Sequence, residues 1–498
     1  MHTIAFRDKI TKKCSIVAIF VTFFFQIYIN FCKFAAFLFR NVSKTLFFYM
    51  VNIIKLRKGL DIKLAGEAEK KKIQLKSSGK FCLAPTDFVG VTPKVVVKEG
   101  DKVKAGDALF INKNCPEVRF ASPVSGTVKA VVRGDRRKVL GIVVDADGKQ
   151  EFADFGIKNV CQLSGDEVIN YLLEAGIFGY INQLPYAVSA VPTEKPKAIF
   201  VSALRDKPLA ADFEFELTGQ EKEWQAGLTA LSRIAKTHLG IGAKQTASAL
   251  TDPKDVEVTV FDGPCPAGNV GVQVNHIDPV NKGETVWTVE PTVVLFIGRL
   301  MTTGKVDLRR TVALVGSEVK APQYVDMTVG EEMQTLLNNS YDKSHKVRII
   351  NGNVLTGTPI GAEGYLGAHS SEITVIPEGN DADELAGWIM PRLKQYSQNR
   401  SYFSWLFGGR RYKLDARIKG GQRHMIMSGE YDSVMPMDIF PEYLIKAIIA
   451  GNIDRMEQLG IYEVSPEDFA LAEFVDSSKL ELQRIVREGL DMLRKENS

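Results

Sequence analysis

The chain has 498 residues and a formal net charge of +4. The roughly 450 residues after position 50 suffice for about three domains of ~150 residues. The small charge, with no basic tract standing out, argues against a nucleic-acid-binding protein. Four cysteines follow position 50 without a Cys-x-x-Cys pair or regular spacing, which argues against disulfide, zinc and iron–sulfur frameworks and fits a reducing cytoplasm: Cys82, Cys115, Cys161 and Cys265.

Residues 1–49 form a hydrophobic extension unlike the rest of the chain. The run Ser15–Phe39 is long enough to span a bilayer and follows several basic residues, as in a signal anchor. The rival interpretation is translated upstream DNA, because these residues contain no Gly or Glu and Asp8 is their only acid. We expect translation to begin at Met50. Mass spectrometry of N-terminal peptides tests this, and a peptide from within residues 1–49 would contradict it.

The next segment, about 53–147, is predicted to be a barrel of short strands. Gly100-Asp101 and Gly106-Asp107 are turn dipeptides six residues apart, where Gly supplies a positive φ. Together with Ser122-Pro123 they resemble the lipoyl/biotinyl carrier fold. The modifiable lysine of that fold would fall at Asn114-Cys115-Pro116, which has none. We therefore predict a rigid barrel-sandwich domain over 50–150, and not a swinging carrier arm.

An α/β pattern follows a linker at Pro192–Pro196. The expected elements are a helix over 166–175, a strand over 198–203, a helix over 220–239, and strands over 256–261, 293–297 and 311–315. Short strands return over 347–377, and helices are expected from Asp381 to the end. Ser465 is a predicted N-cap, and one face of the last helix carries Leu482, Ile485, Val486, Leu490 and Leu493.

The most suggestive motif is the loop Gly263–Gly271, which follows the predicted 256–261 strand. Such a junction can cradle phosphate through backbone N–H groups. The loop lacks both glycine fingerprints, however, and its prolines remove donors, so a structural loop is favoured over a nucleotide site.

The histidines and tryptophans of the chain do not form a recognisable catalytic or binding motif. His238 (expected on a helix), His276 and His369 each lack a second ligand or a catalytic partner close in sequence, and the turn Thr303-Gly304-Lys305 carries no chemistry. The tryptophans are expected to be core or interface anchors: Trp224, Trp287, Trp388 and Trp405. The sequence therefore predicts no catalytic, cofactor-binding or metal residue.

Motifs spread over residues 50–498 carry a specific resemblance: IKLRKGLDIKLAG, VKEGDKVKAGDALF, SPVSGTV, GPCPAGNVG, IDPV, VW, IGRLMTTGKV, VALVG, NGNVLTG, YLG, EITVIPEG, GW, MPMDIFPEYL and SPEDFALAEF. With them the chain resembles the A-subunit family of bacterial sodium-translocating NADH:quinone oxidoreductases. It departs from the family pattern at Cys265, where histidine is expected, and at Asn275-His276. Residues 1–49 have no place in that pattern.

The resemblance implies a multidomain fold related to the electron-input subunits of ion-pumping NADH dehydrogenases. Its parts would be a Rossmann-like α/β domain over 195–320, a small β-grasp-like domain over 321–380, and a helical domain over 381–498. Cluster-bearing relatives place a Cys-Pro where this chain has Met435-Pro436, and a second near Asp476-Ser477. Iron–sulfur ligands are thiolates, and no cysteine follows Cys265, so the helical domain is expected to lack the cluster.

The function implied by the resemblance is that of a cofactor-free peripheral subunit on the cytoplasmic face of the bacterial inner membrane. The six-subunit complex would oxidise NADH, reduce ubiquinone or menaquinone and export sodium, with flavins and iron–sulfur centres on partner subunits. This chain would contribute to or border the quinone site. The alternatives are an acyl or carboxyl carrier and a soluble flavin-dependent NADH dehydrogenase subunit. From Met50 the chain is expected to be soluble alone and to reach the membrane through partners. Its candidate contact stretches, each equally able to be core, are Tyr402–Phe407 and Met425–Met427 with Met435–Met437.

Overall fold

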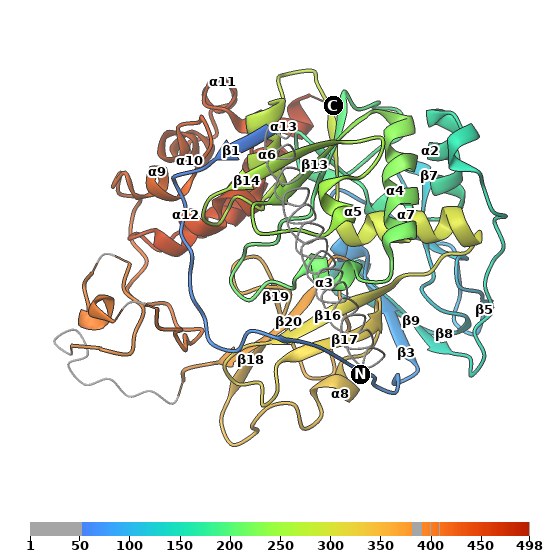
Figure 1. Ribbon diagram of the computed structural model, residues 1–498, viewed down its shortest axis with the longest axis horizontal. Helices are drawn as coiled ribbons and strands as arrows, with labels where there is room; N and C mark the ends of the chain where they lie inside the picture. Colours follow the sequence, from blue (N-terminus) through green and yellow to red (C-terminus); the bar gives the residue numbers. More distant parts are fainter. Residues whose placement is uncertain (1–51, 381–390, 399, 408, 498) are drawn as a thin grey trace, which may run out of the picture. The chain divides into compact units, whose positions relative to one another are not determined.

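The computed structural model describes residues 52–380, 391–398, 400–407 and 409–497 (Figure 1). Residues 54–498 form one compact unit. The apolar run at 15–39, the expected start at Met50 and Trp388 lie outside the described residues. Of the helices in the described part, none is both long and apolar enough to cross a bilayer.

Two small antiparallel sheets build the first domain. One has the order β3 (Lys80–Leu83), β9 (Val139–Ala146), β8 (Gly126–Arg133), β5 (Lys102–Val103), and the other β4 (Pro93–Val95), β6 (Ala108–Asn112), β7 (Cys115–Ala121). Gly100 and Gly106 have φ of +91° and +103°. Asp101 and Asp107 each accept a bond from the backbone N–H three residues earlier, both at 2.7 Å. The two predicted turns are confirmed and share one geometry.

The central sheet has seven strands, ordered β1 (Asn52–Lys55), β14 (Glu257–Asp262), β13 (Lys236–Gly242), β12 (Ala198–Ser202), β15 (Val286–Val289), β10 (Asn182–Leu184), β11 (Val188–Ser189). Strands β12 to β15 are parallel. The chain adds β13 and β14 on one side of β12 and then crosses to place β15 on the other. The strand order therefore reverses between β12 and β15, which is where doubly wound sheets bind ligands.

Helices α2 (Gly165–Glu174), α3 (Phe213–Leu217), α4 (Glu221–Ile234), α5 (Ser248–Thr251), α6 (Val270–Ile277) and α7 (Pro291–Thr303) accompany this sheet. Ser164 and Glu167 form a capping box at the predicted helix α2, and Gly176 follows it at φ +69°. Helices α4 and α7 lie side by side (Figure 1).

Two expectations for this sheet are wrong. Residues 293–297 are not a strand but the interior of α7, which starts at Pro291 and ends at Gly304 in the left-handed conformation. A short apolar run reads the same in a buried helix as in a buried strand, so periodicity could not separate them. His238 is not helical either: α4 ends at Ile234, Ala235 is extended, and His238 lies on β13.

A six-stranded sheet follows, ordered β19 (Thr358–Ile360), β18 (Val347–Asn351), β20 (Glu372–Pro377), β16 (Arg309–Val315), β17 (Gln323–Thr328), β2 (Glu69–Ile73), with helix α8 (Gln334–Leu337). The predicted strand at 311–315 exists as β16. It pairs with β17 and β20, however, and does not continue the central sheet as we expected.

The C-terminal helices are α9 (Glu430–Val434), α10 (Pro441–Ile449), α11 (Ile453–Gln458), α12 (Ala470–Val475) and α13 (Leu482–Glu496). They share one core with α6 and β14, and the five predicted apolar residues of α13 are all buried. Ser465 caps a 3₁₀ turn, Pro466–Phe469, that leads into α12. The helical region does not begin at 381 as expected: between 391 and 429 the described residues hold only the 3₁₀ turn Phe403–Leu406, and 381–390 lie outside them.

Candidate functional site

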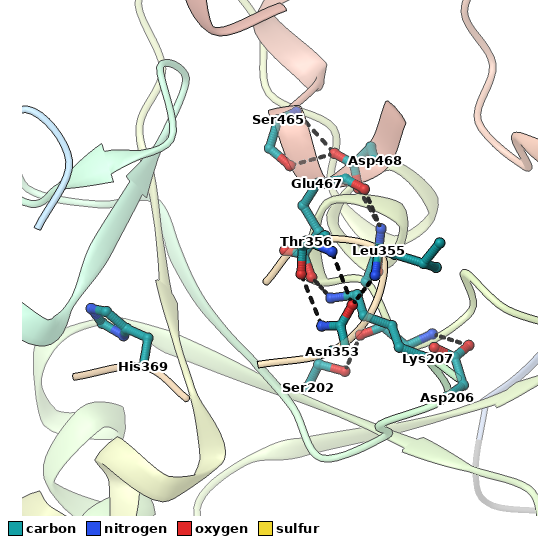
Figure 2. Close-up of polar contacts among 12 residues, drawn as sticks. Ser202, Asp206, Lys207, Asn353, Leu355, Thr356, His369, Ser465, Glu467 and Asp468 are labelled. Carbon is teal, nitrogen blue, oxygen red and sulfur yellow. Dashed lines mark hydrogen bonds and ion pairs between the residues drawn. The ribbon is translucent and has the colours of Figure 1, made fainter. Parts of the chain in front are cut away.

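A cavity of 560 Å³ opens at the carboxyl ends of β12 and β15, where the strand order reverses. Four parts of the chain line it. The first domain gives Thr86, Asp87 and Val89, the α/β domain gives the loops after β12 and β15, the second sheet gives the β18–β19 loop and residues 367–372, and the C-terminal region gives Ser465 and Glu467. Figure 2 shows the last two parts meeting over Lys207 and Asp206. We call this cavity the switch-point cleft.

The glycine-rich loop reaches the cleft only with its end. Ser202 Oγ donates to the Gly268 carbonyl at 2.8 Å, and the Gly268 N–H donates to Asp206 Oδ2 at 2.7 Å. Cys265 lies deeper, where its N–H donates to Asp61 Oδ1 at 3.0 Å and its side chain is buried. The backbone donors at Cys265 and Gly268 are therefore already used by carboxylates of the same chain.

A carboxylate also stands at the N-terminus of α6. Asp468 Oδ2 accepts bonds from the Ser465 N–H (2.9 Å) and Oγ (2.8 Å), and Oδ1 accepts from Asn269 Nδ2 at 3.2 Å (Figure 2). A Cβ placed on Gly271 would lie 2.4 Å from Asp468 Oδ2, so the carboxylate touches the first turn of the helix. A helix N-terminus favours negative charge, and here the chain supplies that charge itself.

Lys207 lies beside this carboxylate but is not free. Its ammonium forms an ion pair with Glu467, the neighbour of Asp468 (Figure 2). This end of the cleft is lined by two acidic residues, Asp206 and Glu467, and by the half-buried Lys207, so acidic groups outnumber basic ones there.

Asp468 should make folding stability depend on pH. Burial, and then the charge of Glu467, raise its pKa from 3.8 to about 6. The folded state therefore keeps a proton that the unfolded state has lost, and stability falls as pH rises from about 4 to about 6. In Asp468→Asn this loss should shrink by about 2 kcal/mol. Urea unfolding of both proteins across that range measures it, and parallel pH profiles would contradict it.

The other end of the cleft holds a histidine–carboxylate pair. His369 Nδ1 lies 2.9 Å from Glu290 Oε1. Burial alone would lower the pKa of His369 and raise that of Glu290, but their mutual attraction reverses both shifts. The rings of Phe88 and Tyr180 lie 5.5 and 5.7 Å from the imidazole. Arg310 Nη1 donates at 2.7 Å to the carbonyl preceding His369. The result is a charged pair that lines the cleft and is backed by two buried aromatic rings.

Between the two ends, Arg205 is held by a buried network. Its Nη1 lies 2.8 Å from Glu216 Oε2, and its Nη2 donates to Thr292 Oγ1 at 2.8 Å. Thr292 Oγ1 in turn donates to Glu216 Oε1 at 2.9 Å. The Glu216 side chain is 1% exposed, so this guanidinium neutralises a charge that water cannot reach.

The structure separates the histidines that the sequence singled out. His276 is exposed on α6 and bonds the Val272 carbonyl, and His238 is buried and stacked on Phe200, so neither reaches the cleft. Gly304 ends α7, so Thr303-Gly304-Lys305 is a helix stop. Only His369 lines the cleft, paired with a residue 79 positions earlier.

Sequence reasoning therefore missed the cleft. The sequence did contain one signal for it, namely charged residues just after two strands of the sheet: Arg205, Asp206 and Lys207 follow β12, and Glu290 directly follows β15. Among the residues placed by the structure, no group of three or more His, Cys, Asp or Glu could hold a metal ion.

Comparison with known proteins gives three family matches: the NqrA N-terminal barrel-sandwich hybrid domain over 54–147, the NqrA second alpha/beta domain over 163–306, and the NQRA C-terminal domain over 311–361. The A subunit of the Na(+)-translocating NADH-quinone reductase of Yersinia pestis bv. Antiqua (strain Angola) is 34% identical over 449 residues, covering 89% of this chain and 100% of the relative. The corresponding A subunit of Neisseria meningitidis serogroup B is 33% identical with the same coverage.

Among solved structures, the NAD+-reducing [NiFe]-hydrogenase in the air-oxidized state aligns with 11% identity and a TM-score of 0.33, covering 70% of this chain and 67% of that one. A score this low supports no conclusion.

Proposed function

Since this chain belongs to the A-subunit family of the Na(+)-translocating NADH-quinone reductases, we propose that it is a peripheral, cofactor-free component of a membrane complex that oxidises NADH, reduces ubiquinone or menaquinone and exports sodium. The observation that carries this is full-length similarity: the match covers 100% of each curated relative. The proposal includes the domain boundaries 50–150, 195–320, 321–380 and 381–498, and attachment to the cytoplasmic face through the other subunits.

The switch-point cleft supports the absence of a flavin or NAD in this chain, because its residues do not fit a phosphate group. The α6 N-terminus is occupied by Asp468, Lys207 is paired with Glu467, and the Gly268 N–H is taken by Asp206. A phosphate brought here would meet three carboxylates of the chain. We place the NAD and flavin of the complex on partner subunits.

The C-terminal helices support the absence of an iron–sulfur cluster. Met435, at the position of the expected Cys-Pro, is 2% exposed and packs in the shared core. Near Asp476-Ser477, where relatives with a cluster have the second Cys-Pro, Asp476 Oδ1 accepts a hydrogen bond from the Ser478 N–H at 3.0 Å. No cysteine follows Cys265, so thiolate ligands are lacking there. We expect the purified chain to contain neither iron nor zinc, which elemental analysis checks.

The His369 end of the cleft supports the part of the proposal in which this chain borders the quinone site. A quinone head is neutral and flat, and its carbonyls accept hydrogen bonds. Val289 and Pro291 give this end of the cleft apolar lining, and the imidazole paired with Glu290 provides a donor, with the Phe88 and Tyr180 rings packed against it.

Deletion and complementation test the proposed function. Membranes from a strain lacking this chain should lose sodium-stimulated NADH:quinone reductase activity, and the full chain should restore it. Undiminished activity in the deletion strain would contradict the proposal. The alternative, a flavin-dependent NADH dehydrogenase, requires flavin in the isolated chain.

Cys115→Ser should leave quinone reduction by the assembled complex nearly unchanged. Cys115 opens β7 after the β6–β7 turn, at the position of the carrier lysine, and is half-buried. Burial raises the pKa of its thiol, so it is a poor nucleophile. Steady-state activity and intact mass check this. A loss of most activity with normal assembly, or a covalent group on Cys115, would show a role for this position.

A further inference from the structure

The region between the second sheet and α9 has a composition of its own. Residues 391–423, here called the 391–423 segment, contain nine Lys or Arg and a single acid, Asp415. That balance of +8 exceeds the +4 of the whole chain, so the remainder is net negative. The bases are spaced along the segment, which is why no compact basic run marks it in the sequence. The positive charge of the compact unit is therefore concentrated in one place.

The same segment exposes large apolar side chains. Phe403, Trp405, Leu406 and Phe407 are 57%, 45%, 58% and 51% exposed, around a buried Ser404. Of the two predicted contact stretches, this one stays on the surface. In the other, Ile426 and Met427 are 50% and 39% exposed, whereas Met435 and Met437 are core. Exposed apolar groups gathered in one turn mark an interaction surface.

Two of the basic side chains lie against the exposed aromatic rings. The Arg400 guanidinium carbon lies 5.3 Å from the ring centre of Trp405, and that of Arg410 lies 5.8 Å from Phe407. Lys394, Arg400, Arg410 and Arg423 form no ion pair with any acid in the described parts of the chain, whereas Arg411, Lys413 and Lys419 do. Four positive charges of the segment, two of them beside exposed rings, are thus available to a partner.

We propose that the 391–423 segment binds an anionic phospholipid surface, with the aromatic rings at the headgroup level and the four unpaired bases on lipid phosphates. Bases interleaved with Trp, Phe and Leu are typical of segments that lie in the membrane interface. A segment with nine bases and one acid matches a broad negative surface better than the mixed charges of a protein. This contact adds to attachment through partner subunits and does not depend on the proposed function.

Vesicle sedimentation of the full-length protein tests the proposal. Binding to phosphatidylcholine vesicles with about one-third phosphatidylglycerol should exceed binding to pure phosphatidylcholine about tenfold or more, and high salt should release it. The basic residues before the apolar 15–39 run also favour anionic headgroups. Their contribution is the same in all variants of the chain, so the difference between variants reports on the 391–423 segment.

Matched triple variants locate the binding surface. K394Q/R400Q/R410Q should weaken binding to the anionic vesicles by about a hundredfold, because each base near such a surface contributes roughly fivefold. The control K94Q/K98Q/K102Q removes three exposed charges from the barrel-sandwich domain and should bind like the wild type. Equal binding to both vesicle types, or equal loss in both triple variants, would overturn the proposal.

Fluorescence supplies a second readout that does not depend on the charge variants. The test uses a Trp388→Phe background, which leaves Trp224, Trp287 and Trp405. Trp224 and Trp287 are fully buried, so a blue shift on adding anionic vesicles should come from Trp405 and vanish when Trp405→Phe is added. An unchanged emission spectrum on binding would show that the rings do not enter the interface. If this segment binds one of the purified partner proteins of the complex and no vesicle, the surface is a protein contact in place of a lipid one.

Discussion

Replacing Arg205 by methionine is expected to destabilise the α/β domain by about 3–5 kcal/mol. The guanidinium lies 2.8 Å from Glu216, whose side chain is 1% exposed, and it also bonds Thr292. Without it, the carboxylate stays buried with Thr292 as its remaining bonded partner, and an uncompensated buried charge is costly. Urea unfolding followed by the fluorescence of Trp224 and Trp287, both within this domain, measures the loss.

Two further variants separate charge from packing at this position. R205M/E216L removes both charges and should recover most of the lost stability, because the unpaired carboxylate is gone. Arg233→Met, on the exposed side of α4, is the matched control and should stay within about 0.5 kcal/mol of the wild type. A loss below about 1 kcal/mol in Arg205→Met would refute a buried ion pair at the cleft.

Gly298→Ala should cost about 3 kcal/mol, although alanine is the better helix former by about 1 kcal/mol. Helices α4 and α7 touch at two glycines. A Cβ on Gly298 would lie 1.7 Å from the Glu223 carbonyl oxygen, and one on Gly227 would lie 2.1 Å from the Val294 carbonyl oxygen. Backbone atoms cannot rotate away, so the helices must separate. Thermal unfolding by circular dichroism follows the effect.

The second glycine and a remote one provide the controls. Gly227→Ala should destabilise similarly, and the double variant should lose less than the sum, because one separation of the helices accommodates both methyl groups. Gly361→Ala, where a Cβ meets nothing within 4 Å, should be neutral. Additive losses in the double variant would mean that the two contacts are independent.

Local patterns in the sequence were sufficient for much of the fold. The Gly-Asp turns, the capped helix α2, the strand β12 and the apolar face of α13 each depend on neighbours in sequence, and each was predicted. Where an apolar run was ambiguous, as in α7, the prediction failed because burial on all sides hides periodicity. The sheet to which β16 belongs is set by long-range pairing, which no local pattern contains.

The contacts that build the cleft could not be predicted, for a related reason. Lys207 meets Glu467, Asn269 meets Asp468, and Glu290 meets His369 across 79 to 260 positions, so no spacing rule links them. That the loop Gly263–Gly271 is structural and binds no phosphate stays a prediction, which the bonds from its donors at Cys265 and Gly268 to carboxylates favour. The reason, a carboxylate from the C-terminal region at the α6 N-terminus, appears only in three dimensions.

The flavin content of the chain, isolated from its partners, tests the central claim most directly. The claim is that an α/β domain with ligand-binding topology serves the complex without a phosphate-bearing cofactor, because its own carboxylates occupy the phosphate positions. The visible absorption spectrum of the purified, native chain should show no flavin band, also after incubation with excess flavin mononucleotide and gel filtration. A flavin band at one equivalent per chain would contradict the account.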